Sequence, residues 1–163
     1  MSWGWPSNFP LFHGYILWEL LGLLLVFYWG IRTTYSGWHL LTVGLLFASL
    51  WGYNVLVHPG IWHTPTYIRA VEAVICIGLA GGYLLQLLQE RKEYFPHKTF
   101  PFWVSFGMLL FFTGNLILYS FAGWIQQTSR ATFTYLWGLH AVLSNLMYVF
   151  YTLGLVWANK NHS

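Results

Sequence analysis

Long apolar runs alternate with short polar connections along the chain. Five runs are predicted as helices, at about residues 10–30, 37–57, 67–88, 102–122 and 131–157. A bilayer's hydrocarbon core is ~30 Å thick, so a helix needs ~20 mostly apolar residues to cross it. Because the runs are continuous and do not alternate with a period of two, they favour helices over the strands of a membrane barrel. The pattern predicts an all-α membrane protein with five transmembrane helices in one compact bundle, a single domain over residues 1–163.

Composition supports the same class of protein. The chain is 57% hydrophobic and only 7% charged, whereas soluble domains carry roughly 25% charged residues. A monomer with so few charges would not stay in water, so the lipid bilayer is the first predicted partner. The net charge of +3 comes from the uneven placement of basic residues among the loops, and it does not indicate nucleic-acid binding.

Basic residues set the predicted orientation. If successive helices cross the membrane in alternating directions, five of the seven basic residues fall on one side of the membrane. Arg69 and Arg130 fall on the other side. The positive-inside rule makes the richer side cytoplasmic, which predicts an inner-membrane protein with its N-terminus out and its C-terminus in. The five are Arg32, Arg91, Lys92, Lys98 and Lys160. Within this set, Arg91, Lys92 and Lys98 are predicted to contact a cytoplasmic partner or anionic lipid.

Polar residues inside the predicted spans are the candidate site. A charge at the bilayer centre costs about 2.5–3.5 kcal/mol on insertion scales, so such groups are expected to face the bundle interior. They form either interhelical hydrogen bonds that fix the bundle or a ligand-sensing or proton-responsive site open to the outer face. The two interpretations weigh equally for Glu19 and His140, and the first is favoured for both asparagines. The candidates are Glu19, Glu72, Asn115, His140 and Asn145.

Glu19 and His140 are predicted to meet. Both lie at the same distance from the outer starts of their predicted helices, and a five-helix bundle can bring those helices together. A close pair would favour the ionised forms, because an opposite charge offsets the loss of solvation. The small residues Gly78 and Gly82 are predicted to admit another helix closely, with a helix of the same chain favoured over the seam of a dimer.

Metal, cofactor and catalytic sites are not predicted. Of seven histidines, only His140 lies deep in a span, so two axial ligands for a haem are not available at matching depth. The loop pair His58 and His63 has no nearby thiolate or carboxylate cluster to complete a zinc site. The lone Cys76 excludes an intrachain disulfide and is expected to be a packing residue. We find no nucleophile–base pair, phosphate loop or paired-carboxylate motif, so no enzyme activity is indicated.

Four segments carry a resemblance to a known family: "YILWELLGLLLVFYW", "IRAVEAVICIGLAGGYLLQLL", "PFWVSFGMLLFFTGNLILYSF" and "WGLHAVLSNLMYVFYTLGL". They resemble the membrane region of Bacteroidetes-type uncharacterised multi-span proteins, some of which are fused to sensor histidine kinases. The shared positions include Glu19, Glu72, Trp103, Gly107, Gly114, Asn115, Trp137, His140, Asn145 and Tyr148. That family typically has about seven spans, so two N-terminal spans are missing by comparison. The resemblance implies a sensory module that signals through a separate partner.

A weaker resemblance concerns the tryptophan-rich sensory (translocator) family. That family has about this length, five spans and many tryptophans, and this chain has eleven tryptophans. The double-proline motif of the family does not occur here. The sequence therefore predicts a non-catalytic sensory or accessory module of the inner membrane, acting through a partner membrane or signalling protein. The alternatives are a protein that binds a tetrapyrrole or lipid, as the weaker resemblance implies, and a structural subunit of a larger complex or oligomer.

Overall fold

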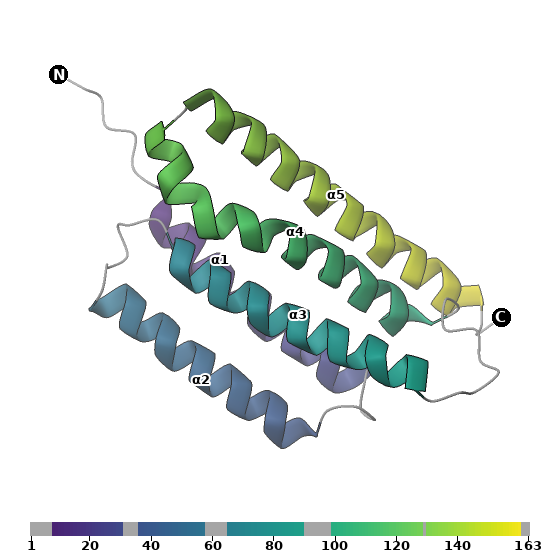
Figure 1. Cartoon of the computed structure of the whole chain (residues 1–163). Coiled ribbons are helices and arrows are strands. Elements are labelled where there is room, and N and C mark those ends of the chain that lie inside the picture. Colours follow the sequence, from purple (N-terminus) through teal and green to yellow (C-terminus); the bar gives the residue numbers. More distant parts are fainter. Residues whose placement is uncertain (1–7, 31–35, 58–64, 90–98, 129, 161–163) are drawn as a thin grey trace.

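The structure, a computed structural model, describes residues 8–30, 36–57, 65–89, 99–128 and 130–160. These residues form five helices (Figure 1). In chain order the helices are α1 (Phe9–Gly30), α2 (Gly37–Leu56), α3 (Thr66–Gln89), α4 (Phe100–Thr128) and α5 (Arg130–Lys160). The described part of the chain is therefore all-helical, as the apolar pattern predicts.

Each helix is long and apolar enough to cross a membrane. The shortest qualifying segments have 20 residues and the longest has 26, which matches the ~20 residues that a bilayer core requires. The five predicted spans are confirmed as helices. The main difference is length, because α4 continues to Thr128, beyond its predicted end at residue 122.

Prolines mark three helix starts. Pro10 and Pro101 lie in the first turns of α1 and α4, and Pro65 directly precedes α3. Proline suits these places because the first backbone N–H groups of a helix have no partner within it. The carbonyl of Pro65 accepts the first turn's hydrogen bond from the backbone N–H of Arg69 at 3.0 Å. Pro65 thus fixes where Arg69 enters the bundle.

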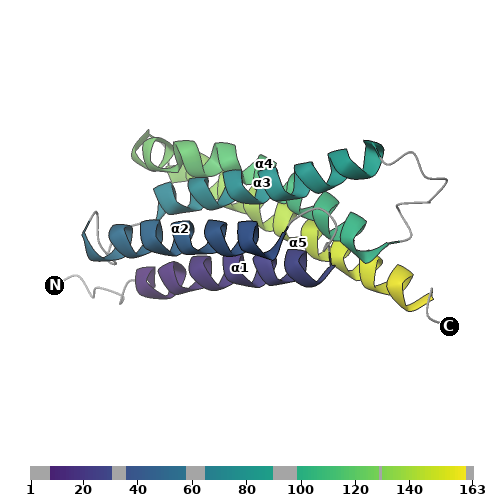
Figure 2. The ribbon, with the colours of Figure 1, turned by 90° about the horizontal axis from the view of Figure 1, so that it is seen from below.

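Helix α4 lies between α3 and α5 in Figure 1, and Figure 2 shows α1 and α2 side by side. Helix α4 packs against α3 on one side and α5 on the other, while α1 lies against α2, α3 and α4. In the membrane-spanning part of α4, 44% of the residues are buried inside the protein, compared with 11% in that of α5. Helix α5 is therefore held by one neighbour and presents most of its surface outward.

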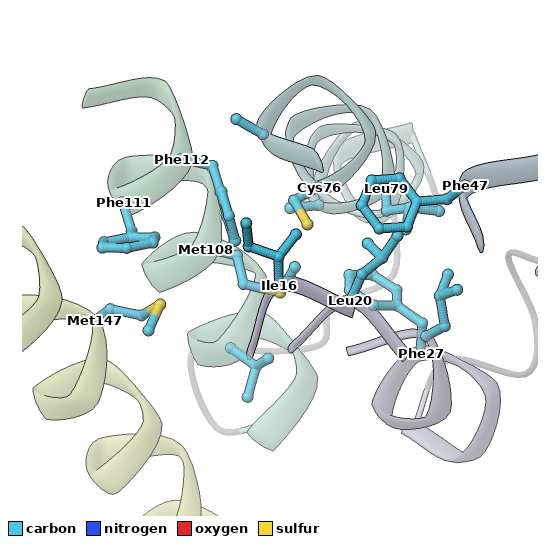
Figure 3. Packing of buried hydrophobic residues seen from close by; sticks show 14 of the residues in the cluster. Ile16, Leu20, Phe27, Phe47, Cys76, Leu79, Met108, Phe111, Phe112 and Met147 are labelled. Atoms are coloured by element: carbon cyan, nitrogen blue, oxygen red, sulfur yellow. The ribbon is translucent and has the colours of Figure 1, made fainter. Parts of the chain in front are cut away.

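One apolar core joins α1, α2, α3 and α4 (Figure 3). From α5, Met147 is buried in this core, and the partly buried Leu143 and Tyr151 pack against it. Its fully or almost fully buried members include Ile16, Leu20, Phe27, Phe47, Cys76, Met108, Phe112 and Met147. Cys76 is a buried free thiol, and its place among apolar side chains agrees with the packing role expected for it. Most of the remaining apolar side chains are exposed on the outside of the bundle, where the bilayer would cover them.

Close approach between α4 and α5 depends on glycines. A Cβ atom at Gly114 would lie 2.7 Å from a methyl carbon of Leu143, and one at Gly154 would lie 3.2 Å from the carbonyl oxygen of Phe100. A side chain at Gly154 would press on the backbone of α4, whereas one at Gly114 would require the side chain of Leu143 to move. By contrast, Gly78 is exposed, and a Cβ atom there would meet no atom within 4 Å. The prediction that Gly78 admits a helix of the same chain is therefore wrong, because α3 turns this face outward.

Candidate functional site

An ionic cluster joins α1 to α3 inside the bundle. The Nη1 atom of Arg69 donates to Oε2 of Glu19 on α1 and, at 2.7 Å, to Oε2 of Glu72 on its own helix. The side chains of Glu19 and Arg69 are 10% and 11% exposed, and that of Glu72 is fully buried. The spacing in the sequence explains the contact between Arg69 and Glu72, since residues three apart share one face of a helix. The contact between Arg69 and Glu19 depends on tertiary packing, because that face of α3 lies against α1.

Two tyrosines enclose the guanidinium. The hydroxyl of Tyr15, one turn before Glu19 on α1, donates to Glu19 Oε1 at 3.0 Å. The guanidinium carbon of Arg69 lies 5.0 Å from the ring centroid of Tyr15 and 5.8 Å from that of Tyr119 on α4. Both distances are within the range of cation–π attraction. Arg69 is thus held by two carboxylates and two aromatic faces from three helices.

A second polar pair joins α4 to α5. His140 Nδ1 and Asn115 Oδ1 are 2.7 Å apart, and Asn115 Nδ2 donates to the carbonyl of Phe111 at 2.8 Å. With the amide nitrogen used in that bond, Oδ1 is the acceptor, which assigns the donated proton to Nδ1 of His140. Tyr119 connects the two groups, because its ring centroid lies 6.1 Å from that of His140. The polar groups therefore extend from α1 through α3 and α4 to α5.

The cluster does not balance its formal charges. One guanidinium faces two carboxyl groups, so the three side chains would carry a net charge of −1 if all were ionised. Two buried polar atoms around the cluster also have no hydrogen-bond partner within the described residues, namely Glu72 Oε1 and the hydroxyl oxygen of Tyr119. An open acceptor and an open hydroxyl beside an excess negative charge are unusual inside a membrane helix bundle, where polar groups are normally satisfied.

Four of the five residues predicted as the site lie in this region: Glu19, Glu72, Asn115 and His140. The fifth, Asn145, is exposed on α5, and we find no hydrogen bond from it to the cluster within the described residues. Leu143 and Met147 turn toward α4, and Asn145 lies midway between them, about 200° around the helix from each. The outward position of Asn145 corrects its assignment to the site.

The predicted pair of Glu19 and His140 is also wrong as a direct contact. Glu19 is bonded to Tyr15 and Arg69, and His140 is bonded to Asn115. Equal depth does not make neighbours of α1 and α5, because α4 is the helix against which α5 packs. The predicted cytoplasmic residues Arg91, Lys92 and Lys98 lie outside the described residues.

Sequence reasoning missed Arg69, which was counted as a loop charge on the outer side. It lies in the first turn of α3, and its side chain points into the bundle toward both glutamates. The spacing of Arg69 and Glu72 could have revealed it, since an Arg three residues before an intramembrane Glu shares its helix face. Tyr119 was missed as well, and no feature of the sequence separates it from the other tyrosines at helix ends.

Comparison of the chain with models of protein families, with curated proteins and with solved structures gives no match. Within the described residues, no group of three His, Cys, Asp or Glu side chains is placed to hold a metal ion. The chemistry of the region therefore has to be considered from the side chains that form it.

Proposed function

We propose that the protein is a sensory or accessory module of the inner membrane, without catalysis of its own, that acts through a separate partner protein. The observation that carries this proposal is the cluster of Arg69, Glu19 and Glu72. Ionisable groups inside membrane helices are rare and commonly mark ion, proton or ligand sites. Here such groups tie two helices together through a single nitrogen atom.

A purely structural role accounts poorly for this arrangement. Taking charges out of water costs several kcal/mol per ion, and well-packed apolar side chains often stabilise a fold as well or better. The neighbouring positions on α1, Ile16 and Leu20, are fully buried apolar residues. An apolar residue at position 19 would therefore suit this helix, and the presence of a carboxylate there supports a role in responding to a ligand or charge.

The position of the cluster suits an outward-facing site. Arg69 lies in the first turn of α3, which is the outer end in the orientation that the basic residues predict. Tyr15, which bonds Glu19, is 48% exposed, so the cluster extends to the surface of the bundle. The basic residues Arg91, Lys92 and Lys98 follow α3 in the sequence and would provide the cytoplasmic contact for the partner or for anionic lipid.

The proposal requires a change at the cluster to alter the far end of the bundle. Spin labels at Gln89 and Asn159, both exposed near the ends of α3 and α5, allow their separation to be measured in nanodiscs. Glu19→Gln replaces the carboxylate that Arg69 binds on α1 with little change in volume, and we expect it to shift the distance distribution. Ser120→Ala is the matched control, because Ser120 is exposed and its hydroxyl bonds only the backbone of its own helix. Identical distributions for the parent, Glu19→Gln and Ser120→Ala would refute the proposal.

A further inference from the structure

We infer that the carboxyl groups of Glu19 and Glu72 share one bound proton beside Arg69, and that this proton is the ligand of the site. The inference rests on the proposed sensory function and gives its ligand a chemical identity. Its basis is the geometry of the cluster, in which one guanidinium nitrogen contacts both carboxyl groups. With one positive and two negative groups, a single proton makes the cluster neutral.

The two carboxyl groups are too close for both to ionise easily. Because each bonds the same Nη1 atom, each lies inside the other's field with only one positive charge between them. Two carboxylates that share a site raise the proton affinity of one of them. Burial acts in the same direction, since a net charge inside a membrane is costly and a neutral cluster is not.

Glu72 is the carboxyl group that holds the proton. Its side chain is fully buried, one of its oxygens accepts from Arg69, and the other oxygen has no hydrogen-bond partner within the described residues. Glu19 is slightly exposed, and its two oxygens already accept hydrogen bonds from Tyr15 and Arg69. The ring of Tyr119, whose buried hydroxyl also has no partner in the described residues, faces the same guanidinium.

The other titratable groups discussed below do not bind this proton in place of the glutamates. Arg69 is bonded directly to Glu72, and Glu19 is bonded to the same nitrogen atom of Arg69. The tyrosines and the thiol of Cys76 ordinarily lose protons only above neutral pH. His140 on α5 is held by Asn115, and the titratable residues of α2, His39 and Tyr53, are exposed on its surface. Protonation of the pair would leave Arg69 bonded mainly to Glu19 on α1. Release of the proton would let Arg69 bind the carboxylates of both α1 and α3 equally.

Infrared spectroscopy of the full chain in nanodiscs tests this directly. A protonated carboxyl group gives a C=O band that a carboxylate lacks, and the chain has only four acidic residues, all Glu. We expect the band at neutral pH, its shift in D₂O and its loss as the pH is raised. It should disappear in Glu72→Gln and also in Glu19→Gln, because either change leaves one carboxylate to one guanidinium. The double variant Glu90→Gln/Glu93→Gln is the control and should keep the band.

Several results would overturn the inference. These are the absence of the band in the unchanged chain at neutral pH, its survival in Glu72→Gln, and its loss in the control variant. Loss of the band when choline is replaced by Na⁺ at constant pH would show that a metal cation, not a proton, is the ligand. If the variants do not fold, the band of the unchanged chain and its titration still decide the matter. A band without any change in the spin-label distances would keep the proton site and reject the sensory function.

Discussion

Arg69 on α3 binds Glu19 on α1 across 50 positions of the sequence. The same guanidinium nitrogen also binds Glu72, one turn further along α3. This single residue therefore decides how two helices meet and fixes the charge of the polar region between them. The candidate site is best understood as the surroundings of Arg69.

The hydrogen bond between Asn115 and His140 should appear as an energetic coupling. Asn115→Ala and His140→Ala each remove one partner, and residues in direct contact commonly show interaction energies of about 0.5–3 kcal/mol. Thermal unfolding in detergent of both single variants and the double variant measures this coupling. Glu19→Gln combined with His140→Ala is the comparison, and it should be closer to additive because the two side chains have different partners. Equal coupling in both cycles would mean that the two pairs are not separate.

The contact between α4 and α5 predicts opposite effects for two Gly→Ala changes on one helix. Gly154→Ala places a methyl group against Phe100 and Trp103, and overpacking of this kind typically costs about 1–3 kcal/mol. Gly138→Ala meets no atom within 4 Å and gains the helix propensity of Ala, worth up to about 1 kcal/mol. We expect a lower melting temperature for the first variant and an equal or higher one for the second. A stabilised Gly154→Ala variant would show that α5 packs differently.

Orientation is open to a test with fusion reporters. A reporter placed after Ser163 should be active in the cytoplasm, and one inserted within residues 60–66 should be active outside, because five of the seven basic residues fall on the C-terminal side. The opposite result at both places would put the cluster of Arg69 near the cytoplasmic face.

A porphyrin titration separates the preferred function from the tetrapyrrole-binding alternative. Eleven tryptophans make intrinsic fluorescence a sensitive measure of a bound pigment. We expect only weak, unsaturable quenching, because the polar region is filled by its own ion pairs. Saturable quenching at low micromolar porphyrin would instead favour the tetrapyrrole-binding class.

The helices could be predicted because membrane insertion depends on local composition. A run of ~20 apolar residues specifies a span almost regardless of its neighbours, and the cost of buried charge directed Glu19 and Glu72 inward. The partners could not be predicted, because they depend on the order in which helices pack. Equal depth predicts a contact between Glu19 and His140. In the structure α5 packs against α4, and His140 bonds Asn115 of α4 instead. An Arg at the start of a span suits a solvated helix end as well as a buried ion pair, so the sequence does not single out Arg69 as the partner of the two glutamates.

Exchanging the charges of Glu19 and Arg69 tests the central claim most directly. The change Glu19→Arg leaves two cations beside one carboxylate, and Arg69→Glu leaves three carboxylates without a cation. Breaking a buried pair in this way typically costs about 3–5 kcal/mol. The double variant restores one cation and two carboxylates at the same place, and unfolding in nanodiscs should show that it recovers at least half of the stability lost by the worse single variant. A double variant no more stable than that single variant would contradict a direct ionic contact between α1 and α3.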